Sequence, residues 1–329
     1  MPEKIFEKID VVGIGNALVD VLVHTDDAAV AALGLTKGTM QLISQAEMEK
    51  LYAHIGPATE MSGGSAANTI AGIASFGGSA AYIGKVANDQ LGKVFRHDIT
   101  AQGITFNTAP HMDNLATGCC IVLVTPDGER TMNTFLGASN ALTTADLDAA
   151  LIGAAQYIYL EGYLFDPPEA KKAFYAAAET AKAGSTKVAL TLSDLFCVGR
   201  HRDDFQKLIT THVDLLFANE QELCAQYQTD NLDAAIAAAR GHCDILAVTC
   251  SAAGAIIITP DEIIKVPAEP VARVVDTTGA GDLFAGGFLY GLTQGLPLAE
   301  CGRLGTVAAA EIISHIGARP QQPLAKLAA

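Results

Sequence analysis

The sequence predicts an α/β fold, in which a mostly parallel central sheet is flanked by helices and a small β-rich lid lies beside it. Short apolar runs alternate with helical patterns along most of the 329 residues, and this alternation is typical of parallel strands that are covered on both faces. Two stretches interrupt the alternation with shorter strand and turn signals. Half of the residues are hydrophobic and 17% are charged, so the chain can bury a large core.

The central sheet is expected from nearly continuous apolar runs, which are the pattern of buried strands. These runs are residues 10–15, 80–86, 156–160, 188–192, 214–218 and 245–249. Apolar residues recur at helical spacing in other segments, namely residues 66–76, 89–102, 168–183, 232–240, 281–293 and 299–316. Helices between strands provide the crossovers that parallel strands need.

The lid is expected from the two stretches that break the pattern. Residues 117–136 read TGCCIVLVTPDGERTMNTFL, and Pro126-Asp127-Gly128 is a strong turn signal between apolar segments. This stretch therefore predicts a β-hairpin. We assign residues 21–62 and 113–136 to a discontinuous lid, and residues 1–20, 63–112 and 137–329 to the main domain.

Charge and cysteine content limit the classes of partner. Lys and Arg number 21 against 36 Asp and Glu, which gives a net charge of −15 and disfavours nucleic acid and anionic membranes. The seven cysteines form no Cys-x-x-Cys pair, as expected for free thiols in a reducing compartment. Residues 1–10 lack the apolar core of a signal peptide. We expect a cytoplasmic monomer or homodimer that binds a small molecule.

The strongest motif is DTTGAGD, residues 276–282, followed by the apolar helical pattern LFAGGFLYGL. The first turn of a helix has N–H groups without intrahelical partners, and glycines allow an anion to approach them closely. Such a loop suits the charge that develops during phosphoryl transfer. Asp282 is placed to accept a proton from a substrate hydroxyl. Taken alone, it is equally well explained as a first-turn carboxylate that stabilises the helix.

Two further segments suggest ligand contacts. Gly63 and Gly64 precede a predicted helix in which Asn68 lies one turn from the start, although a helix cap with a tight turn explains this segment equally well. Asn16 and Asp20 follow the first strand, where α/β folds bind ligands, although an Asp after a strand is more often a cap or turn residue. Leu18 occupies the third glycine position of a dinucleotide fingerprint, which argues against a nicotinamide dehydrogenase.

Weaker signals follow two later strands. Asn219 and Glu222 can organise Mg²⁺ through water, or simply open an exposed helix. The segment TCSAAG, residues 249–254, is either a nucleotide-binding loop or an ordinary turn. The eight histidines show no metal-ligand spacing.

In combination, these segments resemble the ribokinase-like (PfkB) family of carbohydrate and nucleoside kinases, in order and over nearly the whole chain. GGSAANTIAGIASFGG and AYIGKVANDQLG are similar to the first family signature, and DTTGAGDLFAGGFLYGL to the second, which is very specific. The resemblance implies ATP and Mg²⁺ as cofactors. It implies that Asp282 is the base, that Gly279, Ala280 and Gly281 form the anion hole, and that Asn219 and Glu222 support Mg²⁺ and phosphate.

The resemblance also implies contacts with the nucleotide and a cation. Thr249, Ser251 and Gly254 match the nucleotide-binding loop, although Cys250-Ser251 departs from the usual glycine-containing pattern. Thr278 would also border the nucleotide. Together, Asp276 and Thr278 would border a site for a monovalent cation such as K⁺, as the matching residues do in several members of the family.

Within the family, GIGNALVDVLV, VDLLFANEQE and AAAEIISHIGARP are similar to segments of adenosine kinases. The resemblance implies transfer of the ATP γ-phosphate to the 5′-hydroxyl of adenosine, in purine salvage. Ribose hydroxyls would be held by Asn16, Asp20, Gly64 and Asn68, and Gly63 would also belong to the substrate site. The base would pack on Leu18, Leu136, Ala138, Tyr163 and Phe196, because an apolar wall suits a purine. The alternatives are a ribokinase- or fructokinase-like sugar kinase and a non-catalytic ligand sensor on the same fold.

Overall fold

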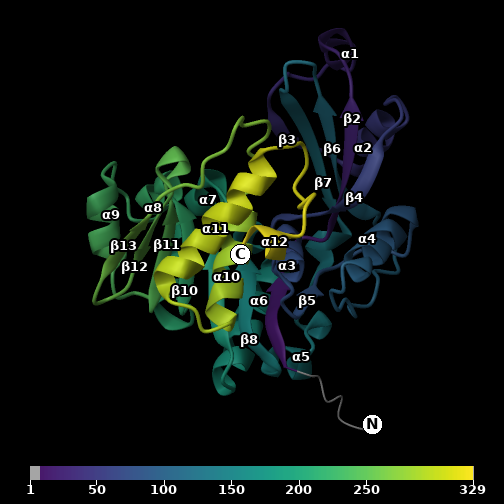
Figure 1. The fold of residues 1–329 in the computed structure, drawn as a ribbon. Helices are drawn as coiled ribbons and strands as arrows, with labels where there is room; N and C mark the ends of the chain where they lie inside the picture. The colour runs from purple at the N-terminus through teal and green to yellow at the C-terminus, as the bar shows by residue number, and fades with distance from the viewer. Residues whose placement is uncertain (1–7, 329) are drawn as a thin grey trace.

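The computed structural model describes residues 8–328 of the chain, which form two sheets (Figure 1). Residues 1–7 and 329 of the predicted main domain lie outside the described residues. A large sheet carries helices on both faces, and a smaller sheet lies at its side (Figure 1). The predicted fold class is therefore confirmed. No helix within residues 8–328 combines the length and apolar character needed to cross a bilayer.

The large sheet has eight strands in the order β13-β12-β11-β10-β9-β8-β1-β5. The six strands from β11 to β5 are parallel, and β12 and β13 pair antiparallel at one edge. The strands are β1 (Ile9–Ile14), β5 (Ala80–Ile83), β8 (Ala155–Glu161), β9 (Lys187–Thr191), β10 (Leu215–Asn219), β11 (Ile245–Thr249), β12 (Ala255–Ile258) and β13 (Ile263–Val266). All six runs predicted as strands lie in this sheet, and their predicted ends differ from the observed strand ends by at most three residues.

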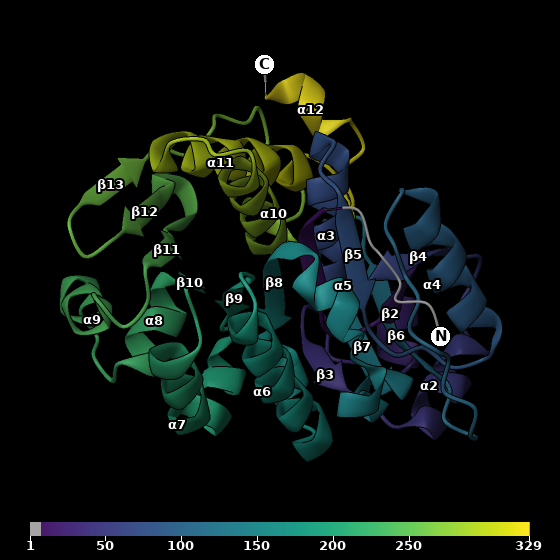
Figure 2. The same cartoon turned by 90° about the horizontal axis from the view of Figure 1, so that it is seen from below.

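Helices cover both faces of the large sheet, as the parallel strands require. Figure 2 shows α3, α10 and α11 on one side of the strands and α5 to α8 on the other. The helices of this part are α3 (Ser65–Phe76), α4 (Gln90–Ala101), α5 (Ala149–Gly153), α6 (Pro168–Ala183), α7 (Leu195–Thr211), α8 (Glu220–Gln226), α9 (Leu232–Ala239), α10 (Ala280–Thr293), α11 (Leu298–Ile313) and α12 (Leu324–Leu327). Short 3₁₀ turns are η1 (Ala138–Ala141), η2 (Thr144–Asp146), η3 (Gly162–Phe165) and η4 (Ser251–Ala253).

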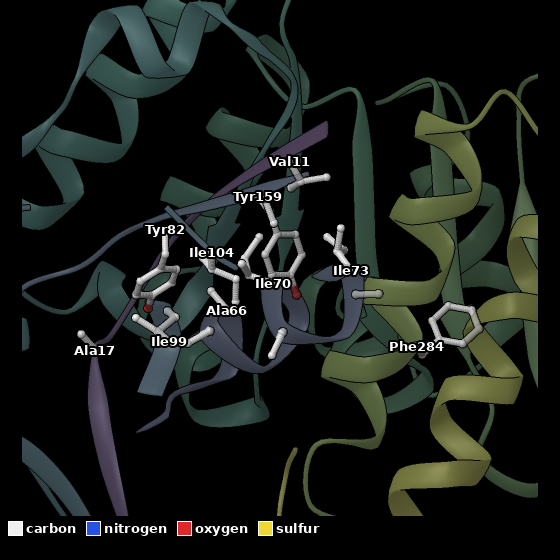
Figure 3. Close-up of a cluster of buried hydrophobic side chains, with 14 of the residues drawn as sticks. Val11, Ala17, Ala66, Ile70, Ile73, Tyr82, Ile99, Ile104, Tyr159 and Phe284 are labelled. Atoms are coloured by element: carbon white, nitrogen blue, oxygen red, sulfur yellow. The ribbon is translucent and has the colours of Figure 1, made fainter. Parts of the chain in front are cut away.

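The core that positions the site lies between the large sheet and α3. Figure 3 shows Val11 of β1 and Tyr159 of β8 packed near Ile70 and Ile73 of α3, all of them almost fully buried. Burying side chains of this size contributes about 1.5–3 kcal/mol each relative to exposure. The start of α3 is therefore held rigidly against the strand ends.

The small sheet has five strands in the order β3-β7-β6-β2-β4. They are β2 (Leu18–His24), β3 (Met40–Leu42), β4 (Thr59–Gly63), β6 (Thr117–Val124) and β7 (Arg130–Gly137), with the helices α1 (Asp27–Ala32) and α2 (Gln45–Tyr52) in the connections. β6 and β7 form the predicted antiparallel hairpin. The division of the chain into a main domain and a moving lid stays a prediction.

Candidate active site

A cavity of about 610 Å³ lies between the carboxyl edge of the large sheet and the small sheet. Because β1, β8, β10 and β11 are parallel, their carboxyl ends meet at this edge. The strands thereby bring Asn16, Glu161, Asn219 and Thr249 to one cavity, although up to 233 positions separate them in the sequence. β2 follows β1 after three residues, so the small sheet begins beside the same edge.

The start of α10 forms one wall of the cavity. Gly279 adopts a left-handed φ of 79° immediately before the helix, and a Cβ atom there would lie 3.0 Å from Ala318. Gly281 and Asp282 lie in the first helical turn, where N–H groups have no carbonyl within the helix to bind. The N–H group of Ala280 donates to the carbonyl of Thr277 at 3.2 Å. The next N–H groups, of Gly281 and Asp282, and the helix dipole remain available to an anion.

Asp282 faces the cavity from this first turn and is held by two donors from α3. Ser65 Oγ donates to Asp282 Oδ1 at 2.6 Å, and Asn68 Nδ2 donates to Oδ2 at 2.8 Å. Burial raises the pKa of Asp282, while the bonds from Ser65 and Asn68 and the charge of Arg319 oppose that rise. The carboxylate is thus fixed in direction and more basic than a solvated one, which suits acceptance of a proton.

The floor of the cavity is a buried polar cluster around Glu161. One carboxylate oxygen accepts from the Asn16 N–H at 3.1 Å and from Asn16 Nδ2 at 2.7 Å, and the other accepts from the Ala66 N–H at 2.7 Å. Burial raises the pKa of Glu161 to about 7. Since Nδ2 is bound to Glu161, Asn16 Oδ1 is left buried without a partner within the described residues. Asn16 lines the cavity and can accept from a ligand hydroxyl.

Asp20 brings a second carboxylate to the cavity from β2. Gly63 on β4 lies directly behind it, since a Cβ atom at Gly63 would collide with the Asp20 carboxylate. Burial raises the pKa of Asp20 to about 6, against the opposing charges of Arg319 and Arg130. Gly63 thus supports Asp20 rather than lining the cavity itself.

Asn219 and Glu222 form a capping box at the start of α8. Glu222 accepts from the Asn219 N–H at 2.9 Å and from Asn219 Nδ2 at 2.6 Å. Burial raises the pKa of Glu222 to about 7, and the nearby carboxylates of Asp194 and Asp282 add to the rise. Within residues 8–328, no three His, Cys, Asp or Glu side chains are grouped so that they could hold a metal ion directly. This excess of carboxylates fits a hydrated divalent cation that arrives with a nucleotide.

Part of the cavity lining, here called the apolar wall, is made by four large apolar side chains. Leu18 and Leu136 belong to the small sheet, and Tyr163 and Phe196 follow β8 and β9. Phe196 is 71% exposed, so its ring is accessible to a ligand. The wall offers a flat ring a place to pack.

Most of the predicted site residues line this one cavity. They are Asn16, Leu18, Asp20, Gly64, Asn68, Leu136, Tyr163, Phe196, Asn219, Glu222, Thr249, Thr278, Gly279, Ala280, Gly281 and Asp282. Ala138 is fully buried at the start of η1, and Asp276 is buried beneath the glycine loop. Ser251 and Gly254 form the turn between β11 and β12, beyond the cavity. The roles assigned to all of the predicted site residues stay predictions.

Sequence reasoning missed several residues that the fold brings here. Ser65 and Glu161 contact predicted site residues directly, and Arg130 and Arg319 provide positive charge beside them. Ser65 lies within the first family signature, so the sequence alone could have indicated it as a site residue. Arg130 and Arg319 lie at the turn end of β7 and after α11, and their surroundings become apparent only in three dimensions.

Known proteins with the same sequence pattern are kinases. The profile of the pfkB family carbohydrate kinases matches residues 27–325. The adenosine kinase of Sinorhizobium meliloti is 48% identical, with a TM-score of 0.90, over 97% of this chain and 98% of that one. A probable sugar kinase from Rhizobium etli is 46% identical, with a TM-score of 0.90, over 98% of each chain. A fructokinase of Klebsiella pneumoniae is 28% identical over 82% of this chain and 94% of that protein.

Proposed function

The chain belongs to the pfkB family of carbohydrate kinases, and we propose that it transfers the γ-phosphate of ATP to the 5′-hydroxyl of adenosine, giving AMP and ADP. The arrangement of Asp282 carries the proposal. Its carboxylate lies at the start of α10 beside the glycine loop, and Ser65 and Asn68 hold it toward the cavity.

In the proposed reaction, the substrate hydroxyl oxygen attacks the γ-phosphorus, and its proton passes to Asp282. The bond from the γ-phosphorus to the β,γ-bridging oxygen breaks, and ADP leaves. Gly279, Ala280 and Gly281 would hold the transferring group through backbone N–H groups and the helix dipole. A Mg²⁺ ion bound to ATP would neutralise phosphate charge, and Asn219 and Glu222 would hold its water ligands.

The assignment of adenosine as the substrate rests on the cavity lining, which has a polar part and an apolar part. Asn16, Asp20 and Asn68 provide polar groups for ribose hydroxyls, with Gly64 allowing close approach. Leu18, Leu136, Tyr163 and Phe196 provide an apolar surface that suits a purine. The 48% identical relative named adenosine kinase supports the same assignment.

A free sugar is the second candidate. The buried Glu161–Asn16 cluster supports it, because this floor offers polar groups to a small polyol. The relatives named probable sugar kinase and fructokinase support it as well.

The test is ADP release with Mg-ATP across adenosine, cytidine, ribose and fructose, with Asp282→Asn as the inactive control. We expect the highest kcat/KM with adenosine. Turnover of ribose or fructose without turnover of adenosine would replace the adenosine assignment by the sugar assignment. Tight adenosine binding by calorimetry without ADP release would support the sensor hypothesis.

A further inference from the structure

Arg319 follows α11 in a loop that is fixed at several points. The Gly317 N–H donates to Asp276 Oδ2 at 3.1 Å, and Glu311 Oε1 accepts from the N–H groups of Gln321 and Gln322 at 2.9 and 3.1 Å. The backbone is therefore held on both sides of Arg319, close to the start of α3, whose Asn68 the side chain contacts.

The Arg319 guanidinium connects two polar side chains. Its Nη2 donates to Ser62 Oγ at 3.0 Å, and its Nη1 donates to Asn68 Oδ1. Ser62 is itself held, because its N–H and hydroxyl donate to Asp98 Oδ2 at 2.8 and 2.6 Å. A continuous series of hydrogen bonds therefore runs from Asp98 on α4 to Asp282 on α10.

The orientation of the Asn68 amide follows from its two neighbours. A guanidinium only donates hydrogen bonds, and an ionised carboxylate only accepts them. The amide oxygen must therefore face Arg319, and the amide nitrogen must face Asp282. With the amide turned over, both contacts would be repulsive. Arg319 thus holds the Asn68 amide in the orientation in which its nitrogen donates to Asp282.

We propose that Arg319 is a positioning residue for phosphoryl transfer: it fixes Asn68, and through Asn68 it fixes the carboxylate that accepts the substrate proton. This proposal rests on the proposed kinase function. Asn68 lines the cavity, whereas Arg319 lies behind it. Arg319 therefore acts through Asn68 and not by touching the substrate.

The charge of Arg319 acts on the same carboxylate. Around the guanidinium lie Asp20 of β2, Asp98 of α4, Asp282 of α10 and the phenol of Tyr82 of β5. The positive charge opposes the rise in the pKa of Asp282 and of Asp20. Without Arg319, the pKa of both carboxyl groups would rise further.

The experiment compares Arg319→Met with Arg96→Met on the substrate that the wild type turns over best. Arg96 is a part-buried arginine that donates to the carbonyls of Phe106 and Thr108 at 3.0 and 2.7 Å, away from the cavity. We expect R319M to lower kcat roughly 10- to 100-fold with KM changed less than about threefold, the scale of a misplaced catalytic group. R96M is expected to lower the melting temperature alone.

A double-mutant cycle separates positioning from general loss of structure. In an Asn68→Ala background, R319M is expected to cause a smaller loss of kcat than in the wild type, because the Asn68 amide that Arg319 positions is gone and only its charge still acts on Asp282. Arg319→Lys keeps the charge but not the planar fork, so its kcat should fall between wild type and R319M. R319K also serves if R319M does not fold. Equal losses from R319M in both backgrounds would overturn the proposal.

A titration by ¹³C NMR of labelled aspartate carboxyls, with Asp282→Asn for assignment, does not depend on turnover. We expect the pKa of Asp282 to rise in R319M, remain near the wild-type value in R319K and not change in R96M. An unchanged pKa in R319M would overturn the proposal. Absence of ADP release by the wild type with every substrate would instead refute the proposed function, and the titration would still decide whether Arg319 acts on Asp282.

Discussion

The guanidinium of Arg130 lies 2.9 Å from the carboxylate of Asp276, and it also donates to Thr278 Oγ1. Arg130 begins β7 of the small sheet, and Asp276 begins the glycine loop before α10. The side chains are only 11% and 4% exposed. A buried ion pair therefore joins the small sheet to the glycine loop.

Replacing Arg130 should destabilise the protein, because the buried carboxylate of Asp276 would lose the positive charge that it pairs with. Arg130→Met leaves Asp276 buried without its cation, and we expect a loss of about 3–5 kcal/mol in the free energy of unfolding. Arg130→Met/Asp276→Asn removes the lone charge as well and should regain much of this loss. Urea unfolding followed by circular dichroism measures both variants. A double mutant that is as unstable as the sum of the single mutants would contradict the argument.

Asp282→Asn tests whether this carboxylate accepts the substrate proton. We expect kcat to fall by about 10²–10⁴-fold, the usual contribution of a general base, with substrate affinity retained. The control is Asp233→Asn, which removes an exposed carboxylate from the first turn of α9. Both aspartates favour their helix through the dipole, so the control shows how much of the effect comes from the loss of a first-turn carboxylate alone. A similar, small effect in both variants would leave Asp282 as a helix-stabilising residue.

The sequence predicted the sheet and the glycine loops because both depend on local patterns. Buried parallel strands are continuous apolar runs, and Gly64 and Gly279 adopt the positive φ that glycine favours. α7 was not predicted, and the fold places a non-helical residue, His201, inside it. Glu161 was missed because it continues an apolar strand, and its partners Asn16 and Ala66 are remote in the sequence.

Glu161 should make the protein less stable as pH rises from about 5 to 8. Its pKa is raised from 4.5 to about 7, so the folded chain binds the proton more tightly than the unfolded chain across that window. Stability therefore falls as pH rises through it, and Asp20 and Glu222, with raised pKa values of about 6 and 7, act in the same direction. Across this window, the free energy of unfolding should fall by on the order of 3 kcal/mol because of Glu161, at about 1.4 kcal/mol per pKa unit.

Melting temperatures at pH 5.5 and 8 check this dependence. Glu161→Gln cannot ionise and should reduce the change in melting temperature between the two pH values. The control Glu179→Gln, at an exposed position of α6, should keep the wild-type change. An equal pH dependence in wild type and Glu161→Gln would show that Glu161 does not titrate in this range.

Phe196 should contribute to nucleoside binding and little to folding. Its side chain is 71% exposed at the cavity wall, so Phe196→Ala removes almost no buried core. If the base packs there, KM for adenosine should rise roughly 10-fold, since an aromatic contact adds about 0.5–1.5 kcal/mol beyond its buried area. Ile263→Ala, at another exposed apolar position on β13, should change neither KM nor stability. A sugar substrate confined to the polar floor would leave KM unaffected by Phe196→Ala, so this variant also separates the two substrate classes.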